Sequence, residues 1–541
     1  MAETTLVRSS PKTGTVLAQG RPFWIVDGRA YDFTDWMGRH PGGATWFQQS
    51  QGRDISALFH SYHRDPARLQ KILGKYRIDD FSEEDLLPQL GVPPFLLAPD
   101  FDARTDLPKL DYSDDESLLA EIRRRVNAKF SKKELKRYDR AFDAVTAAIG
   151  VAHVATLALL IAGVLPAWAF VVLMVITRTA LAGAGHYQIH RKYKQRRARG
   201  FNLPMGKALF DINYVGTSLI GTDGHVLLHH PYLGSGADVK KTFFDSMLRL
   251  HPLLRIPGYT LHKLGICLTG LSLRAWEISR FEQPGKDTPS RKPLQRDASR
   301  SDFWLVRALL VTELVLCLAT GHGLAWFAQF FLSLWFNTFL VVASHDFEEE
   351  STEEEELAAL PEALRNDWAA QQIATSYDLT VVGNRWIDLF LSAGLSPHRV
   401  HHVLPWQGSG FANLASEATV REVCEEVGIA WERPRNLILE RLPAVIRHYL
   451  GRPAKAATPQ REGSMPPPPP GERPMKPPPG PGEAPTPPPA GQQPMQVPPD
   501  GSFQMPPPPP GSVPAPPARS VKGQVGDLFR YTWDGFKGVG V

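Results

Sequence analysis

The sequence predicts a multidomain chain: a small α+β domain, then an all-α membrane domain with four spans, then a disordered proline-rich tail. Three observations lead to this prediction. The chain has 541 residues, about three times the length of one ordinary domain. Four apolar stretches in its middle are long enough to cross a bilayer, which takes about 20 residues of helix. Near its end, 27 of the 49 prolines fall between residues 453 and 517, and such a segment cannot build a packed core.

We expect the α+β domain at residues 15–85, a linker and juxtamembrane helix at 86–140, the membrane domain at 141–451 and the tail at 452–541. Charge and cysteine content then restrict the function. The 60 Lys and Arg residues nearly balance the 56 Asp and Glu residues, which argues against nucleic acid as a partner. Cys267, Cys317 and Cys424 have no CxxC spacing, which excludes a disulfide framework and a thiolate zinc site. The first residues contain no apolar run, so we expect no secretory signal peptide and a cytosolic N-terminus.

The segment 22–80 alternates short strand-like runs with helical stretches, and it holds two histidines that could bind one metal ion. His40 lies in HPGG and His63 lies in FHSYH. Glycines let the backbone turn tightly against a flat ligand, and two imidazoles could close both axial positions of a haem iron. Such an iron passes electrons but has no open site for oxygen. Alternatively, HPGG is only a turn and His63 a surface residue, and His60 competes for the second position.

This stretch resembles the cytochrome b5 haem domain over about 60 residues. The match rests on VDGRAYDFT, on HPGG, on the run from Asp54 to Phe59 and on the second histidine. The resemblance implies haem b held by His40 and His63 as axial ligands. The family's spacing of aromatic residue and histidine fits His63 better than His60.

The four predicted spans are residues 144–165, 167–185, 303–321 and 323–344. Pro166 separates the first two, which we interpret as a hairpin. The basic cluster at 191–199 that follows should stay in the cytosol, and four spans then return the chain to the same side. The apolar stretch 253–275 contains several charged residues, so we interpret it as interfacial. Arg178, Arg307 and Glu313 lie within spans, and we interpret them as snorkelling side chains or as an intramembrane pair.

Three histidine clusters and one further histidine lie at the predicted cytosolic margin of the spans. They are His186 and His190; His225, His229 and His230; His345; and His398, His401 and His402. Spacings of three and four residues put imidazoles on one face of a helix, and nine imidazoles suffice for two metal ions. Histidine suits iron, copper, nickel or zinc. The haem site favours iron, because a one-electron donor serves only a redox-active metal. A lone histidine at a membrane edge is more often merely interfacial.

The clusters resemble those of the membrane fatty acid desaturase and hydroxylase superfamily, from about residue 142 to residue 428. The match rests on the order and spacing of the clusters, the two hairpins, QQIATSYDL and GLSPHRVHHVLP. It implies an oxygen-dependent di-iron lipid desaturase in the endoplasmic reticulum, with the clusters and both chain ends in the cytosol. The resemblance also implies two iron ions and O2. It implies that electrons come from NADH or NADPH through cytochrome b5 reductase and the fused haem domain.

Six of the histidines are expected to be indispensable for catalysis: His186, His190, His229, His230, His401 and His402. The variant spacing of the second cluster makes His225 its least certain ligand. At the position of His398, front-end desaturases have glutamine, so the chain departs from that subfamily. His398 can bind metal or can hydrogen-bond a ligand or a bound water. The second role predicts that His398→Gln keeps partial activity.

Two alternatives remain open at this point. A fatty acid or sphingolipid hydroxylase could use the same site, because oxygen rebound before loss of the second hydrogen gives an alcohol. A haem-bearing membrane adaptor is the alternative without catalysis, but its clusters should have lost histidines and none is missing. The substrate is a membrane lipid or an acyl-CoA. The two MPPPPPG segments of the tail could bind a polyproline-binding module or serve as a spacer.

Overall fold

The computed structural model describes residues 8–10, 14–16, 22–42, 45–50, 54–78, 110, 117–191, 209, 212–214, 225–226, 229–233, 251–269, 300–345 and 357–451. The predicted proline-rich tail, most of the predicted linker and the basic cluster beyond Arg191 lie outside these residues. The chain divides into two compact units, 1–455 with 520–541, and 456–519. All described residues belong to the first unit.

The N-terminal part combines short strands with short helices, as an α+β domain requires. Its strands form two antiparallel pairs, β1 (Arg8–Ser10) with β2 (Gly14–Val16), and β3 (Trp24–Val26) with β4 (Arg29–Tyr31). Its helices are α1 (Thr34–Met37), α2 (Thr45–Ser50), α3 (Ser56–Tyr62), η1 (Ala67–Leu69) and α4 (Gln70–Leu73). Strand β3 and helix α3 pack together, and Trp24, Phe33 and Phe59 lie in their shared core.

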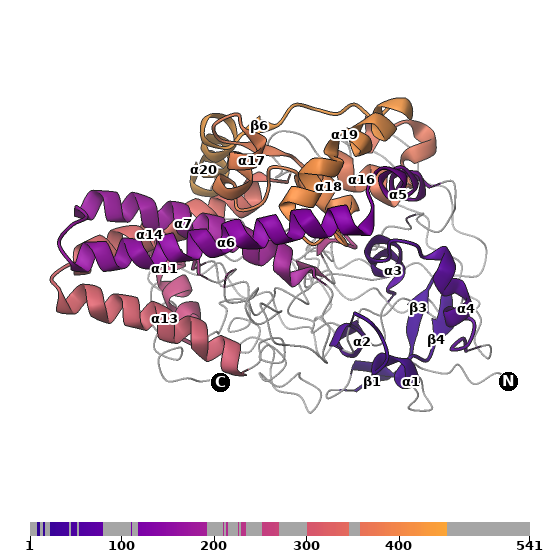
Figure 1. The fold of residues 1–541 in the computed structure, drawn as a ribbon, viewed down its shortest axis with the longest axis horizontal. Helices are drawn as coiled ribbons and strands as arrows, with labels where there is room; N and C mark the ends of the chain where they lie inside the picture. The colour runs from indigo at the N-terminus through magenta and orange to yellow at the C-terminus, as the bar shows by residue number, and fades with distance from the viewer. Residues whose placement is uncertain are drawn as a thin grey trace, which may run out of the picture. The chain divides into compact units, whose positions relative to one another are not determined.

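Three long apolar helices form the membrane part, and a fourth helix runs beside them (Figure 1). The three that are long and apolar enough to cross a bilayer are α6 (Lys132–Ile161), α7 (Ala167–Ile189) and α14 (Gly323–Ala343). The fourth, α13 (Arg300–Ala319), packs against α14 and α6. Its apolar part within the described residues is only Ala308–Ala319, so a fourth crossing stays a prediction.

Both helices of the first hairpin extend beyond the predicted spans. Helix α6 begins at Lys132, not near residue 144, because Ser131 and Glu134 form a capping box and the charged segment after them continues the helix. Helix α7 begins after Pro166 and continues to Ile189, so its last turn carries His186. The additional turn of α7 therefore connects its apolar segment to the first histidine cluster.

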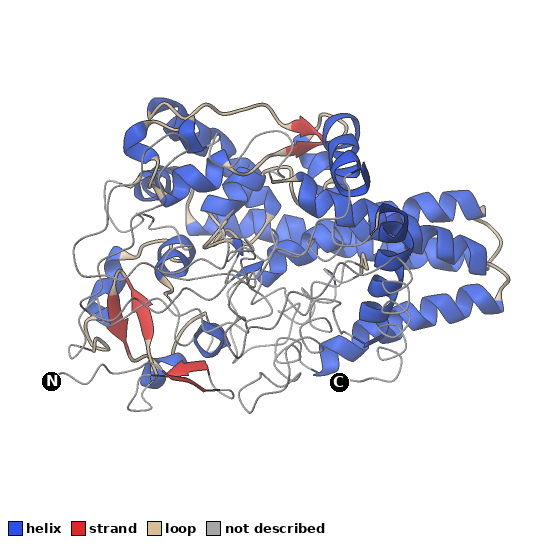
Figure 2. Ribbon diagram, turned by 180° about the vertical axis from the view of Figure 1, so that it is seen from behind, coloured by secondary structure: helices blue, strands red, loops and turns tan. Residues whose placement is uncertain are grey.

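The remaining helices include the one that carries the third histidine cluster. They are α5 (Leu118–Lys129), α11 (Pro252–Thr269), η7 (Glu362–Leu364), α16 (Trp368–Ala374), α17 (Arg385–Leu391), α18 (His398–Val403), α19 (Gly410–Glu426), the π-helical turn η8 (Leu437–Arg441) and α20 (Leu442–Gly451). Two short parallel strands, β5 (Leu379–Thr380) and β6 (Arg435–Asn436), are the last of the strand pairs among the described residues (Figure 2). Helix α18 packs against both α16 and α19, which buries its histidines. The interfacial position predicted for 253–275, where α11 lies, stays a prediction.

Helix α7 approaches the turn after α17 very closely. A Cβ atom on Gly183 would lie 2.4 Å from the carbonyl carbon of Ala393, so the contact requires glycine. Gly394 in that turn has φ of +89°, and the Tyr187 hydroxyl donates a hydrogen bond of 2.9 Å to its carbonyl oxygen. This packing fixes the end of α7 that carries His186.

A polar cluster lies deep among the membrane helices. Arg178 of α7 is fully buried and forms an ion pair with Glu313 of α13. The Arg178 Nε atom also donates a hydrogen bond of 3.0 Å to Gln329 of α14. His153 of α6 bonds to Glu313 at 3.3 Å and to the Thr177 hydroxyl at 2.8 Å. Arg178 and Glu313 therefore form a buried ion pair and do not snorkel. Its position within the membrane stays a prediction, as the crossing by α13 does. His153 was not expected from the sequence.

Arg178→Gln is expected to destabilise the protein by about 3–5 kcal/mol, because it leaves the Glu313 carboxylate buried without its cation. The measurement is the thermal unfolding midpoint of the detergent-purified protein. The double variant Arg178→Gln/Glu313→Gln removes both charges and should recover much of the lost stability. A single variant as stable as the unchanged protein would contradict a structural role for the pair.

Candidate metal centre and haem pocket

All nine histidines predicted as metal ligands are described, and eight of them form two compact groups. The first group is His186, His190, His225, His230 and His401; the second is His229, His345 and His402. Within each group the candidate ligand atoms lie within 4.8 Å of one another. The groups are adjacent, since the stacked rings of His230 and His402 have centroids 4.3 Å apart.

Four segments supply these side chains. Helix α7 supplies His186 in its last turn and His190 as its C-cap, and α18 supplies the third cluster. His345 follows the C-cap of α14. His229 and His230 belong to a short described segment between α7 and α11. The site therefore forms where two membrane helices end against the buried helix α18.

The separations between ring nitrogens suit ligands that share a metal ion. The Nε2 atom of His225 lies 2.7 Å from that of His186 and 3.2 Å from that of His230. Metal–imidazole bonds of about 2.0–2.1 Å place neighbouring ligand nitrogens about 3 Å apart. The Nε2 atom of His398 lies 3.1 Å from that of His402, so the ninth histidine adjoins the second group.

The second group is oriented by hydrogen bonds on the outer ring nitrogens. The Nδ1 atom of His402 donates to Gln372 Oε1 at 2.8 Å, and that of His398 donates to the Ser344 carbonyl at 3.2 Å. The Nδ1 atom of His345 donates to the Thr375 carbonyl at 3.3 Å. A proton held on Nδ1 leaves the Nε2 lone pair for a metal. The role of Gln372 was not predicted from the sequence, although this residue lies in the QQIATSYDL segment.

One histidine of each group has a pKa that keeps it neutral, and so able to bind metal, at neutral pH. Burial is the main cause that lowers the pKa of His230 and His402 well below the ordinary value, and neighbouring imidazoles lower it further. Both side chains are therefore neutral near pH 7, and the neutral imidazole is the form that binds metal. The residues present fit two adjacent metal ions.

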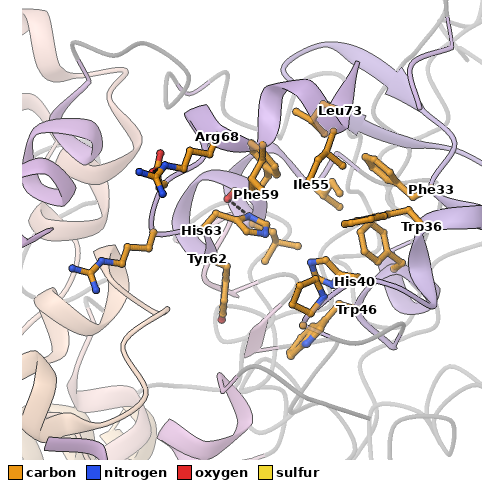
Figure 3. Close-up of a pocket in the computed structure, with 18 of the residues that line it drawn as sticks. Phe33, Trp36, His40, Trp46, Ile55, Phe59, Tyr62, His63, Arg68 and Leu73 are labelled. Carbon is orange, nitrogen blue, oxygen red and sulfur yellow. Dashed lines mark hydrogen bonds and ion pairs between the residues drawn. The ribbon is translucent and has the colours of Figure 1, made fainter. Parts of the chain in front are cut away.

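The second candidate site is a cavity of about 650 Å³ that is lined mostly by the N-terminal domain (Figure 3) and also by Asn127, Lys132, His190 and Val226. His40 and His63 face it, with ring centroids 6.1 Å apart, and aromatic side chains such as Phe33, Trp36 and Phe59 form its walls. With metal–nitrogen bonds of about 2 Å, imidazoles on opposite sides of one iron have ring centres about 6 Å apart. The apolar walls and the ring spacing fit haem.

The surroundings of the two histidines favour His63 over His60 as the partner of His40. The Nδ1 atom of His63 donates to the Phe59 carbonyl at 2.8 Å (Figure 3), which leaves Nε2 for a metal. His60 instead bonds to both carboxylate oxygens of Asp27, at 2.9 and 3.1 Å. In HPGG, a Cβ atom on Gly42 would lie 2.6 Å from His40 Cε1. The second residue after His40 must therefore be small.

Comparison with known proteins agrees with both sites. The family model for fatty acid desaturase matches residues 162–434, and that for the cytochrome b5-like haem/steroid binding domain matches residues 14–82. No solved structure matches. These matches confirm the two resemblances found in the sequence. The first domain indicates haem, and the desaturase family implies iron.

Relatives are similar over short parts of their length. A cytochrome b5-related protein of Drosophila virilis is 35% identical over 13% of this chain and 46% of its own length. Delta(5) fatty acid desaturase A of Dictyostelium discoideum is 43% identical over 10% of this chain and 12% of its own. An acyl-lipid (8-3)-desaturase of Physcomitrium patens is 31% identical over 21% and 20%. Since the desaturase model covers more than half of the sequence, this chain belongs to the fatty acid desaturase family and carries a cytochrome b5-like domain at its N-terminal end.

Proposed function

We propose that the protein is an oxygen-dependent di-iron desaturase that introduces a double bond into a fatty acyl chain and receives electrons through its own haem domain. The observation that carries the proposal is the pair of adjacent, buried histidine groups at the ends of apolar helices. The presence of a haem-sized cavity between His40 and His63 supports the electron supply.

The five histidines of the first group are proposed to hold one iron ion. His229, His345 and His402, together with His398, are proposed to hold the other. When bound, the two ions supply O2 activation and accept electrons one at a time. The chain's own residues hold the ligands in place: Gln372 orients His402, and the tight packing at Gly183 fixes the end of α7.

The electron count explains why a donor domain is useful. Removing two hydrogens from an acyl chain while O2 becomes two waters consumes four electrons, of which the substrate gives two. The other two are proposed to come from NADH or NADPH through cytochrome b5 reductase and the haem domain. A haem held by both His40 and His63 would be suited to electron transfer and would have no position left for O2.

The substrate is proposed to be an acyl chain carried by a membrane lipid. The name of the Physcomitrium relative, an acyl-lipid desaturase, supports this choice over acyl-CoA. We propose the endoplasmic reticulum as location, with both histidine groups on the cytosolic side. We also propose a polyproline-binding module as a partner of the proline-rich tail.

The test is lipid mass spectrometry of a eukaryotic host that expresses the full chain. Acyl chains with two hydrogens fewer are expected, and a variant with His186→Ala should not form them. Chains with one added oxygen would indicate the hydroxylase instead. Unchanged lipids from protein that contains its iron and haem would favour the adaptor.

A further inference from the structure

Tyr62 belongs to the haem cavity. It is the last residue of α3, directly precedes His63 and lines the cavity (Figure 3). Trp46, another residue of the cavity wall, lies with its ring centroid 6.3 Å from that of Tyr62. A haem bound by His63 would therefore have Tyr62 as one of its close neighbours.

The same side chain also contacts the metal centre. The rings of Tyr62 and His190 lie nearly parallel, at 13° with centroids 6.0 Å apart. The Tyr62 hydroxyl and the Nδ1 atom of His190 form a hydrogen bond. His190 belongs to the first histidine group, in which its ring lies 4.6 Å from that of His401 and 4.5 Å from that of His230. One side chain thus contacts both candidate sites.

When a metal ion is bound, the donor and the acceptor of this hydrogen bond are defined. An imidazole has two nitrogens, and Nδ1 of His190 faces the Tyr62 hydroxyl. Nε2 is the nitrogen left for a metal, so the proton resides on Nδ1 and is donated to the tyrosine oxygen. By accepting that proton, Tyr62 would hold the His190 ring with Nε2 toward the metal, a positioning role like that of Gln372 beside His402.

Neighbouring contacts hold Tyr62 in this position from both sides. After it, the Arg64 Nη2 atom donates to the Phe130 carbonyl at 2.6 Å, and Asn127 donates to the Arg64 carbonyl at 3.0 Å. Before it, the Tyr232 hydroxyl donates to the Asp54 carbonyl at 3.0 Å. Asn127 and Phe130 lie in and after α5, and Tyr232 follows the second histidine cluster. Helix α3 is therefore anchored next to the metal centre at several points.

We propose that Tyr62 is a positioning residue through which the haem site and the metal centre are coupled for electron transfer within one chain. This inference rests on the proposed function. In the step, one electron leaves a ferrous haem, which becomes ferric, and one ferric ion of the metal centre becomes ferrous. Tyr62 is neither oxidised nor deprotonated, and no bond breaks. A pyridine-nucleotide-dependent reductase restores the ferrous haem, and two such steps supply the two external electrons.

The test measures electron transfer without oxygen or substrate. Full-length, iron-loaded protein is reduced at its haem by a flash with a flavin photoreductant, and haem reoxidation is followed by visible absorbance. Tyr62→Leu is expected to slow reoxidation by about 10- to 100-fold, the usual cost of losing a residue that orients a ligand. Tyr62→Phe, which keeps the ring but loses the hydroxyl, should have an intermediate rate. Tyr76→Phe, in the same domain but outside the cavity wall, is the matched control and should equal the unchanged protein.

Three further measurements separate coupling from a structural role. The haem spectrum and its midpoint potential should be unchanged in both Tyr62 variants, and rates are compared at equal iron per protein. Equal rates for Tyr62→Leu and the unchanged protein at equal iron would overturn the inference while leaving the proposed function intact. The unchanged protein is also compared with and without iron. If its ferrous haem is oxidised equally fast in both states, the proposed function fails as well.

Discussion

His401→Ala and His402→Ala are each expected to abolish desaturation, and each should remove a different metal ion. His401 belongs to the group of five and His402 to the adjacent group. Both side chains are fully buried, so no side chain from the protein surface can replace the lost imidazole. We expect iron to fall from about two ions per chain to about one in each variant.

The measurement is iron per protein, together with Mössbauer spectra that distinguish the two sites. His322→Ala, at the N-cap of α14 and outside both groups, is the matched control and should keep its iron and its activity. Loss of both ions in either variant would show that the groups depend on each other. Retention of both would show that these histidines are not ligands.

For His398, the geometry changes the expectation drawn from the sequence. Its Nδ1 atom is engaged by the Ser344 carbonyl, and its Nε2 atom lies 3.1 Å from that of His402. This arrangement favours the role of ligand over that of a hydrogen-bonding neighbour. We therefore expect His398→Gln to lose the same ion as His402→Ala, whereas the partial activity predicted from the sequence assumed the other role.

His40→Ala and His63→Ala are expected to eliminate the low-spin haem spectrum of the full-length protein and to stop electron supply from the reductase. Each removes one of the two imidazoles that face the cavity and that we propose as axial ligands of the haem. The spectrum is recorded in the visible range, and haem is quantified per protein. Activity should return only if a separate cytochrome supplies the electrons.

The control for this prediction is His60→Gln, because glutamine can still hydrogen-bond Asp27 while no imidazole remains. It should keep the low-spin spectrum. A spectrum lost in His60→Gln and kept in His63→Ala would reverse the assignment of the second ligand.

The sequence predicted the parts that depend on local spacing. The intervals within HRVHH and HYQIH place their histidines on one side of a helix end, and apolar length indicated α6, α7 and α14. The predicted start of this span, residue 144, lies about three turns after the start of α6 at Lys132. Hydropathy indicates where the apolar segment begins and not where a capped helix begins. The contacts of Gln372, Tyr62 and His153 were not predicted, because their partners lie far away in the sequence. These partners are His402, His190 and Glu313, respectively.

The polar cluster around Arg178 has a consequence for which sequence changes α7 can tolerate. Arg178 and His186 are eight residues apart on this helix, a rise of about 12 Å. Arg178 is held by contacts with α13 and α14, and His186 is held within the first histidine group. Inserting or deleting a single residue between them would rotate one end by about 100° relative to the other. Apart from Gly183, whose close contact with Ala393 requires glycine, the short apolar segment between them can therefore change in composition but not in length.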